Sequence, residues 1–253
     1  MALDGRTAVV TGAGRGIGAA VARALSDAGA AVLLSARSES GVEAVARALR
    51  ARGRIARAVM CDVTDPAAVR ELGRAASETL ERVDILVNNA GVASSAPLQH
   101  ITLEEWNRVM AINATGTFLC TQAFVPEMVE RGFGRVVNVA SVAGLAGARY
   151  AAAYSASKHA VIGFTRCIAA EVADRGVTIN AVCPGFVDTP MTDATLDNVM
   201  AKTGLPRDRA LEAVLHAAGQ SRLVQPEEVA RAVLSLCSDE AGAINGQSIP
   251  IAP

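Results

Sequence analysis

Lysine and tyrosine are nearly absent from this 253-residue sequence. Lysine occurs only at positions 158 and 202 and tyrosine only at positions 150 and 154, while arginine supplies almost all other positive charge. Their absence elsewhere draws attention to the stretch YSASKHAVIGFTR, in which Tyr154 and Lys158 stand four positions apart in an apolar, helix-like segment. This pair is the first candidate for chemistry, and a surface contact on an amphipathic helix is the alternative.

The sequence also has no excess of charge and no long apolar run. Its net charge is −1 and its pI is near 6.3, which excludes the strong basic field that nucleic acid or an anionic membrane requires. No apolar run approaches the roughly 18 residues of a membrane span. The first strand-like segment begins within a few residues of Met1 and leaves no room for a signal peptide. We therefore expect a cytoplasmic protein without nucleic-acid or membrane partners.

Metal-binding patterns are missing as well. The five cysteines are scattered, mostly lie in apolar runs and show no C-x-x-C spacing, and the three histidines are far apart in sequence. We interpret the cysteines as reduced core residues and predict no metal.

What is present is an alternation of short β-branched runs with longer segments of helical periodicity. This pattern is typical of βα units around a parallel sheet whose crossovers cover both faces. The sequence thus predicts one domain spanning residues 1–253, an α/β doubly wound (Rossmann) fold with a seven-stranded parallel sheet. The expected strands are 6–12, 31–36, 55–62, 84–90, 134–141, 177–185 and 246–252, and the expected helices lie near 16–29, 39–52, 66–81, 102–131, 152–174 and 226–237.

One long segment interrupts this alternation. Residues 189–222 lie between the sixth strand and the last helix, and an excursion of this length in a compact domain is commonly a lid or binding element. We predict that it is a substrate lid.

A glycine-rich loop, TGAGRGIG, follows the first strand directly. Gly12, Gly16 and Gly18 stand where the chain must turn sharply, let a pyrophosphate approach the backbone and pack a helix on the strand. The helix that follows offers free N–H groups to that pyrophosphate. Gly14 would complete a G-x-G-x-x-G-like pattern with Gly12, but the spacing Gly12-x3-Gly16-x-Gly18 fits better. Ile17, in the same loop, is also predicted to contact the dinucleotide. Strand before and helix after make dinucleotide binding the stronger interpretation than a structural turn.

The end of the second strand bears on which dinucleotide binds. A carboxylate there would accept hydrogen bonds from a ribose 2′-OH, whereas a 2′-phosphate needs a cation. The chain has Ala36 at that point, Arg37 immediately after and Arg15 within the glycine loop, so NADP(H) is favoured and NAD(H) stays possible. The alternative is that both arginines are solvated surface charges. Asp62 is a candidate for the adenine amino group, with Val63 beside it, or else the N-cap of the next helix.

Tyr154 and Lys158 share one helix face if their segment is helical. A nearby ammonium favours the phenolate, so the spacing predicts a lowered tyrosine pKa and a proton exchange with a substrate oxygen. Ser141 follows the fifth strand at the carboxyl edge of the sheet, where ligands of such folds bind. It is a candidate to hold the carbonyl oxygen, and a capping serine is the alternative.

Six motifs in order resemble the short-chain dehydrogenase/reductase family over almost the whole chain. They are T-G-x3-G-x-G at 11–18, NNAG at 88–91, the asparagine of INATG at 113, the serine at 141, Y-x3-K at 154–158 and PGFVDT at 184–189. The resemblance implies that Tyr154 is the acid/base, that Ser141 holds the carbonyl and that Asn113 holds a water of the proton relay. It implies that Lys158 lowers the tyrosine pKa and binds the nicotinamide ribose. It also implies cofactor contacts from Asn89, Ala90, Gly91, Pro184, Gly185, Val187 and Thr189, together with Tyr154 and Lys158.

Within the family, the catalytic helix and cofactor turn look most like reductases of 3-oxoacyl thioesters and polyketide ketoreductases. We therefore expect NADPH-dependent reduction of a ketone, such as a 3-oxoacyl thioester, to a secondary alcohol. Arg149 and Arg207 are candidate contacts for an anionic carrier of that substrate, or else solvated charges. An NAD-dependent alcohol or 3-hydroxyacyl-CoA dehydrogenase and a non-catalytic cofactor-binding sensor are the alternatives. The family also implies a homotetramer that packs the helices near 102–131 and 152–174.

Overall fold

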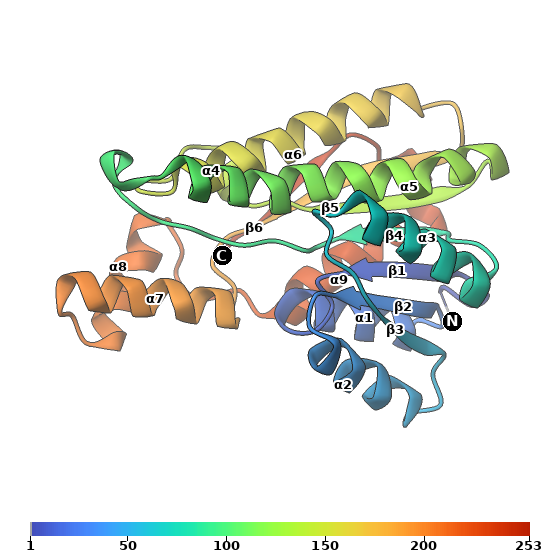
Figure 1. The fold of residues 1–253 in the computed structure, drawn as a ribbon, viewed down its shortest axis with the longest axis horizontal. Helices are drawn as coiled ribbons and strands as arrows, with labels where there is room; N and C mark the ends of the chain where they lie inside the picture. Colours follow the sequence, from blue (N-terminus) through green and yellow to red (C-terminus); the bar gives the residue numbers. More distant parts are fainter. Residues whose placement is uncertain (1) are drawn as a thin grey trace.

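The computed structural model describes residues 2–253 as a seven-stranded parallel sheet with helices on both faces (Figure 1). The strand order is β3-β2-β1-β4-β5-β6-β7, and every neighbouring pair is parallel. The chain therefore starts in the middle of the sheet, builds outward to one edge and then returns to build the other. The strands are β1 (Thr7–Thr11), β2 (Ala31–Ala36), β3 (Ala56–Met60), β4 (Ile85–Asn88), β5 (Gly134–Val139), β6 (Val177–Pro184) and β7 (Ser248–Ile251).

Two apolar cores hold the helices on the sheet. Successive residues of β1 serve opposite faces, with Val10 in one core and Val9 in the other. Helices α1, α2 and α9 cover the first face, and α3, α5 and α6 cover the second (Figure 1). Burial on both faces explains why the central strands read as continuous apolar runs. The helices are α1 (Gly16–Asp27), α2 (Glu39–Arg50), α3 (Pro66–Leu80), α4 (Leu103–Met110), α5 (Gly116–Arg131), α6 (Ala152–Glu171), α7 (Pro190–Thr203), α8 (Arg207–Ala217) and α9 (Pro226–Cys237).

The predicted fold class is confirmed, and all seven predicted strands are present within one or two residues of the expected bounds at most ends. The helix expected near 102–131 is present over residues 103–131, but it is not α-helical throughout. Its middle is a π-helical turn, η2 (Ala111–Thr115), between α4 and α5. Single π-turns inside α-helices are frequent at functional sites, and this one contains Asn113.

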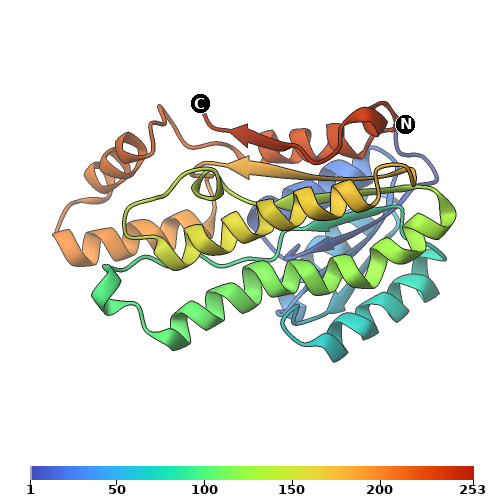
Figure 2. The ribbon, with the colours of Figure 1, turned by 90° about the horizontal axis from the view of Figure 1, so that it is seen from above.

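Segment 189–222 forms two helices, α7 and α8, at the edge of the molecule toward which the strands point (Figure 2). The α8 residue Arg207 bonds Asp193 on α7, which joins the two helices. The segment therefore lies at the carboxyl ends of the strands, where ligands bind in doubly wound folds.

Candidate active site

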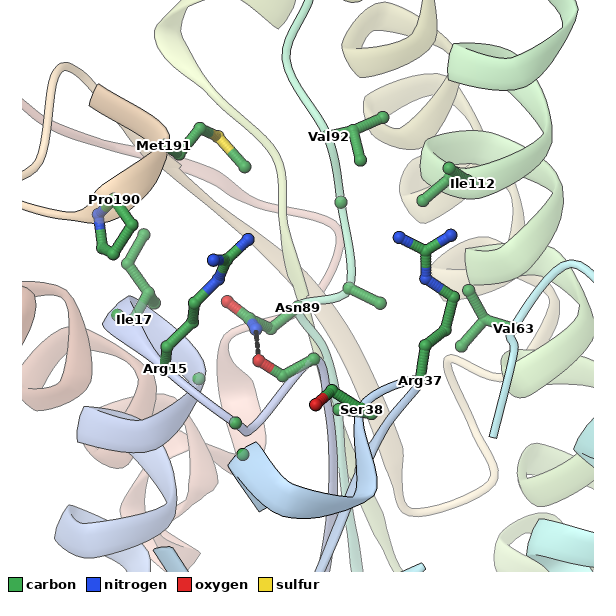
Figure 3. A pocket seen from close by; sticks show the side chains of 18 of the residues that line it. Arg15, Ile17, Arg37, Ser38, Val63, Asn89, Val92, Ile112, Pro190 and Met191 are labelled. Atoms are coloured by element: carbon green, nitrogen blue, oxygen red, sulfur yellow. Dashed lines mark hydrogen bonds between the residues drawn. The ribbon is translucent and has the colours of Figure 1, made fainter. Parts of the chain in front are cut away.

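A cleft of about 490 Å³ opens at the carboxyl ends of β1, β2 and β4. Arg15 and Arg37 extend along opposite sides of it, and Asn89 lies between them (Figure 3). Most of the predicted cofactor residues meet here although they are far apart in sequence. The lining includes Gly12, Arg15, Gly16, Ile17, Gly18, Arg37, Asp62, Val63, Asn89, Ala90, Gly91 and Thr189.

The glycine loop is held against the end of β4 by close backbone contacts. Gly12 has φ +64°, and a Cβ there would lie 2.8 Å from the Cα of Ala90. A Cβ on Gly18 would overlap the Asn89 side chain and the Gly12 carbonyl. Glycine is therefore required at both positions, for the left-handed turn and for the close approach.

Thr11, the last residue of β1, fastens the NNAG segment in place. Its hydroxyl accepts from the backbone N–H groups of Asn89 and Ala90, both at 3.1 Å. The Asn89 amide in turn donates to the carbonyl oxygens of Thr11 and Gly12. Sequence reasoning did not assign Thr11 a role, although a hydroxyl at the end of a buried strand is a visible signal.

The end of the cleft where the sequence predicts the adenosine half of the cofactor contains Arg37, Asp62 and Val63. The Asp62 carboxylate accepts from the backbone N–H and the hydroxyl of Thr64, at 2.9 and 2.8 Å. Burial raises the pKa of Asp62, but these bonds and the nearby Arg37 outweigh burial, so the net pKa lies below its usual value. The capping alternative for Asp62 is wrong, because Asp65 is the N-cap of α3 and accepts from Ala67 N–H.

The opposite end of the cleft is apolar. Pro190 and Met191 lie on the side of Arg15, and Val92 and Ile112 lie on the other side (Figure 3). Five predicted cofactor contacts are not among the lining residues: Tyr154, Lys158, Pro184, Gly185 and Val187. Val187 is buried in the core and pairs with Val224. Lining residues to which sequence reasoning gave no cofactor role are Ser38, Gly41, Cys61, Val92, Ile112, Pro190 and Met191.

Tyr154 and Lys158 stand one turn apart on α6, beside Ser141 at the end of β5. The Lys158 ammonium nitrogen lies 5.7 Å from the Tyr154 ring centroid and donates to the Val139 carbonyl at 2.8 Å. Ser141 Oγ donates to the Pro184 carbonyl at 3.3 Å and accepts from Ala143 N–H at 3.1 Å, as the N-cap of a short 3-10 helix, η3 (Val142–Gly144). The same hydroxyl lies near enough to the Tyr154 phenol to lower its pKa. Ser141 therefore caps η3 and also interacts with the phenol of Tyr154.

Burial sets the charges of this pair. It raises the pKa of the Tyr154 phenol, opposed by the hydrogen bond with Ser141, and it lowers the pKa of Lys158 to about 8. The expected lowering of the tyrosine pKa is wrong in this structure. Desolvation dominates because the phenol is itself buried, and the cost of a buried phenolate exceeds the opposing effect of Ser141. The tyrosine is accordingly held in its protonated form at neutral pH.

Asn113, in the π-turn, joins this pair to the cleft. Its Oδ1 accepts from Val92 N–H and its Nδ2 donates to the Val92 carbonyl, both at 2.9 Å. The same Nδ2 donates to Ser157 Oγ at 2.9 Å, and Ser157 donates to the Tyr154 carbonyl. The side chain of Asn113 thus holds the cleft wall and the first turn of α6 in register, a positioning role that the sequence did not predict.

Across residues 2–253, no cluster of three or more His, Cys, Asp or Glu side chains is arranged to hold a metal ion. Within the same range, no helix is both long and apolar enough to span a membrane.

The fold and this site define a dinucleotide-dependent oxidoreductase. The family profile described as "short chain dehydrogenase" matches residues 6–199. The chain belongs to this family, as its motifs predict.

Several named proteins are similar over nearly their full length. A 3-oxoacyl-[acyl-carrier-protein] reductase from Synechocystis is 41% identical over 252 residues, covering 99% of this chain and 96% of the relative. The reductase of the same description from Escherichia coli, FabG, is 38% identical over 251 residues, covering 99% and 97%. A crystal structure of a variant of actinorhodin polyketide ketoreductase with NADPH matches with a TM-score of 0.94 at 38% identity, covering 98% and 95%.

Proposed function

We propose that this enzyme uses NADPH to reduce the ketone of a 3-oxoacyl thioester to a secondary alcohol. The observation that carries the proposal is the meeting of Ser141, Tyr154 and Lys158 at the carboxyl end of β5, linked through Asn113 to the wall of the dinucleotide cleft. The reductases from Synechocystis and Escherichia coli support the substrate class, because each is named for a 3-oxoacyl group on a carrier protein.

The cleft fits a dinucleotide. Gly12, Gly14 and Gly16 of the glycine loop line it, and the N-terminus of α1 would present its free N–H groups to a pyrophosphate. When bound, the reduced nicotinamide supplies a hydride to the carbonyl carbon. Lys158 would bond the nicotinamide ribose, since its ammonium nitrogen lies next to Gly91, a residue of the cleft lining. Thr189 also lines the cleft.

Two side-chain hydroxyl groups interact with the carbonyl oxygen of the substrate. The hydroxyls of Ser141 and Tyr154 bond that oxygen and stabilise the negative charge that develops on it. Tyr154, kept protonated by burial, then donates its proton to the oxygen. The phenolate that forms is stabilised by the Lys158 ammonium on the same helix face.

The adenosine end favours NADP(H). Arg15 and Arg37 both border the cleft, while Ala36, at the end of β2, offers no carboxylate to a ribose 2′-OH. The NADPH of the actinorhodin ketoreductase structure and the NADP of a putative gluconate 5-dehydrogenase structure support this choice. The D-threitol dehydrogenase of Mycolicibacterium smegmatis, 39% identical, is the reason to keep an oxidative alcohol dehydrogenase as the second candidate.

Segment 189–222 would act as the substrate lid. Its helix α7 begins against the cleft at Pro190 and Met191, and Asn198 on α7 donates to Ser95 Oγ at 2.9 Å. The lid is thus joined to the loop that continues from Val92. Substrate would enter between α7 and this loop, in reach of Tyr154.

We further propose a cytoplasmic homotetramer. Phe118 on α5 is 42% exposed and meets Phe164 on α6 edge to face at 6.1 Å between ring centroids. An aromatic pair on the outer surface of these two helices suits burial against a second copy. Sedimentation analysis of the wild type and of Phe118→Glu tests this, since the charge should dissociate the assembly.

The function is tested by following nicotinamide absorbance with a 3-oxoacyl-CoA, a truncated 3-oxoacyl thioester and simple ketones, each with NADPH and with NADH. Reduction of the thioesters with NADPH supports the proposal. A faster NAD-dependent oxidation of secondary alcohols would replace it with the dehydrogenase.

A further inference from the structure

Three segments meet at the entrance to the site. Ser95 bonds Asn198 on α7, and the next residue, Ala96, donates its N–H to the Tyr150 carbonyl at 2.8 Å. Tyr150 lies two residues before the start of α6 and four residues ahead of Tyr154. The turn that carries Tyr150 and the proposed lid therefore flank the same loop.

Tyr150 has an unusual backbone. Its φ is +64°, in the left-handed region that a bulky side chain rarely adopts. Its side chain is not stabilised by the core, because the residue is 51% exposed. Strained positions that packing does not explain are concentrated at ligand sites. The ring instead contacts its neighbour, with Arg149 Cζ 4.7 Å from the ring centroid.

The two arginines that the sequence suggested as carrier contacts differ in their partners. Arg207 is neutralised on the lid, where it bonds Asp193 and lies 3.9 Å from Asp197. Arg149 makes no ion pair with any residue of the described range 2–253, and its surroundings in the turn 145–150 are exposed. Its charge is therefore available to a ligand at the entrance.

We propose that Arg149, held on the Tyr150 ring, binds an oxyanion that the substrate carries away from its reacting carbonyl. In a carrier-linked thioester this group is the phosphate of the arm, so the identity of the ligand rests on the function proposed above. A guanidinium presents a planar pair of donors that matches a phosphate or carboxylate. Stacking on the ring restricts the side chain before the ligand arrives and reduces the entropy lost on binding.

The test compares KM and kcat for two matched pairs of substrates. The first pair is a 3-oxoacyl-CoA and the same acyl group on a truncated thioester without phosphate. The second is a keto acid and its methyl ester. For Arg149→Gln we expect KM for the CoA substrate to rise about five- to tenfold with kcat retained, and KM for the truncated thioester to change less than about twofold. Added salt should raise KM for the CoA substrate in the wild type and much less in the variant.

Variants of Tyr150 distinguish the effect of the aromatic ring from the effect of the backbone conformation at this position. Tyr150→Phe should behave as the wild type, whereas Tyr150→Asn keeps a residue that tolerates positive φ but removes the stack, and should raise KM for the CoA substrate alone. Arg70→Gln, which removes an exposed arginine of α3 and changes net charge equally, is the control and should change nothing.

The outcomes are distinct. Equal KM changes for charged and neutral members of a pair, or no change, would overturn the inference about Arg149 and leave the reductase intact. A selective loss for the keto acid alone would identify the substrate's own carboxylate as the oxyanion. If the wild type reduces no thioester, calorimetry with pantetheine phosphate and pantetheine still decides: a preference for the phosphate that Arg149→Gln abolishes supports the inference, and equal binding refutes it.

Discussion

The ammonium of Lys158 lies 5.7 Å from the ring centroid of Tyr154 and is anchored to the Val139 carbonyl at 2.8 Å. Because Val139 is the last residue of β5, this bond ties the catalytic helix to the strand that leads to Ser141. Lys158 as a whole residue is only 5% exposed, so the pair lies in a desolvated setting. The protonation of both side chains is therefore governed by burial and by their protein neighbours, and solvent contributes little.

Replacing Tyr154 with phenylalanine should remove the proton donor and leave the cleft intact. We expect kcat to fall by about 10²- to 10⁴-fold, the usual contribution of a positioned acid, while NADPH affinity stays within about threefold. Steady-state rates and a fluorescence titration of NADPH measure the two effects. The control is Tyr150→Phe with a neutral ketone, which should retain turnover. Substantial turnover by the Tyr154 variant would contradict its assigned role.

The pKa of Lys158 predicts how NADPH capture depends on pH. Burial lowers this pKa to about 8, so the cation that we propose to bond the ribose predominates below pH 8 and is lost above it. Because kcat/KM for the cofactor reports groups of the free enzyme, it should decline above about pH 8. Tyr154, whose pKa is raised, stays protonated through this range and adds no second decline.

The profile is measured from pH 6 to 9.5 at constant ionic strength. Lys202→Met, which removes the other lysine, an exposed one on α7, should leave the profile unchanged. A flat profile up to pH 9.5 would show that the charge of Lys158 is not needed to bind NADPH.

Arg37→Ala should change cofactor preference. Loss of one charge-assisted contact to the 2′-phosphate should lower kcat/KM for NADPH by about 10- to 100-fold. NADH should be affected less than about threefold, because its ribose has no phosphate. Arg47→Ala, at an exposed arginine of α2, is the matched control. Equal losses with both cofactors would mean that Arg37 does not recognise the phosphate.

Gly18→Ala tests the close packing of the glycine loop. The added Cβ would overlap the Asn89 side chain and the Gly12 carbonyl, so we expect a loss of about 1–3 kcal/mol in the free energy of unfolding. NADPH affinity should fall at least about tenfold as the loop shifts. Gly73→Ala, in the interior of α3 with no atom within 4 Å of the new Cβ, should instead stabilise by about 0.5–1 kcal/mol. Urea unfolding and NADPH titration measure both.

The sequence by itself determined the parts of this protein that depend on local periodicity and spacing. Alternating apolar runs and helical segments were enough to predict the seven strands, since burial on both faces leaves that pattern in the chain. The order strand, glycine loop, helix was enough to predict the cleft. The four-residue spacing of Tyr154 and Lys158 was enough to place both on one helix face.

The tertiary structure decided what depends on partners distant in the chain. The π-turn that lets Asn113 reach Val92 is invisible in a helical pattern. Only the fold shows that, within residues 2–253, Arg207 forms an ion pair while Arg149 forms none. Burial, which raises the Tyr154 pKa instead of lowering it, is a sum over many surrounding elements. Periodicity is written locally in a sequence, whereas desolvation and the choice of partner arise only when separate segments pack together.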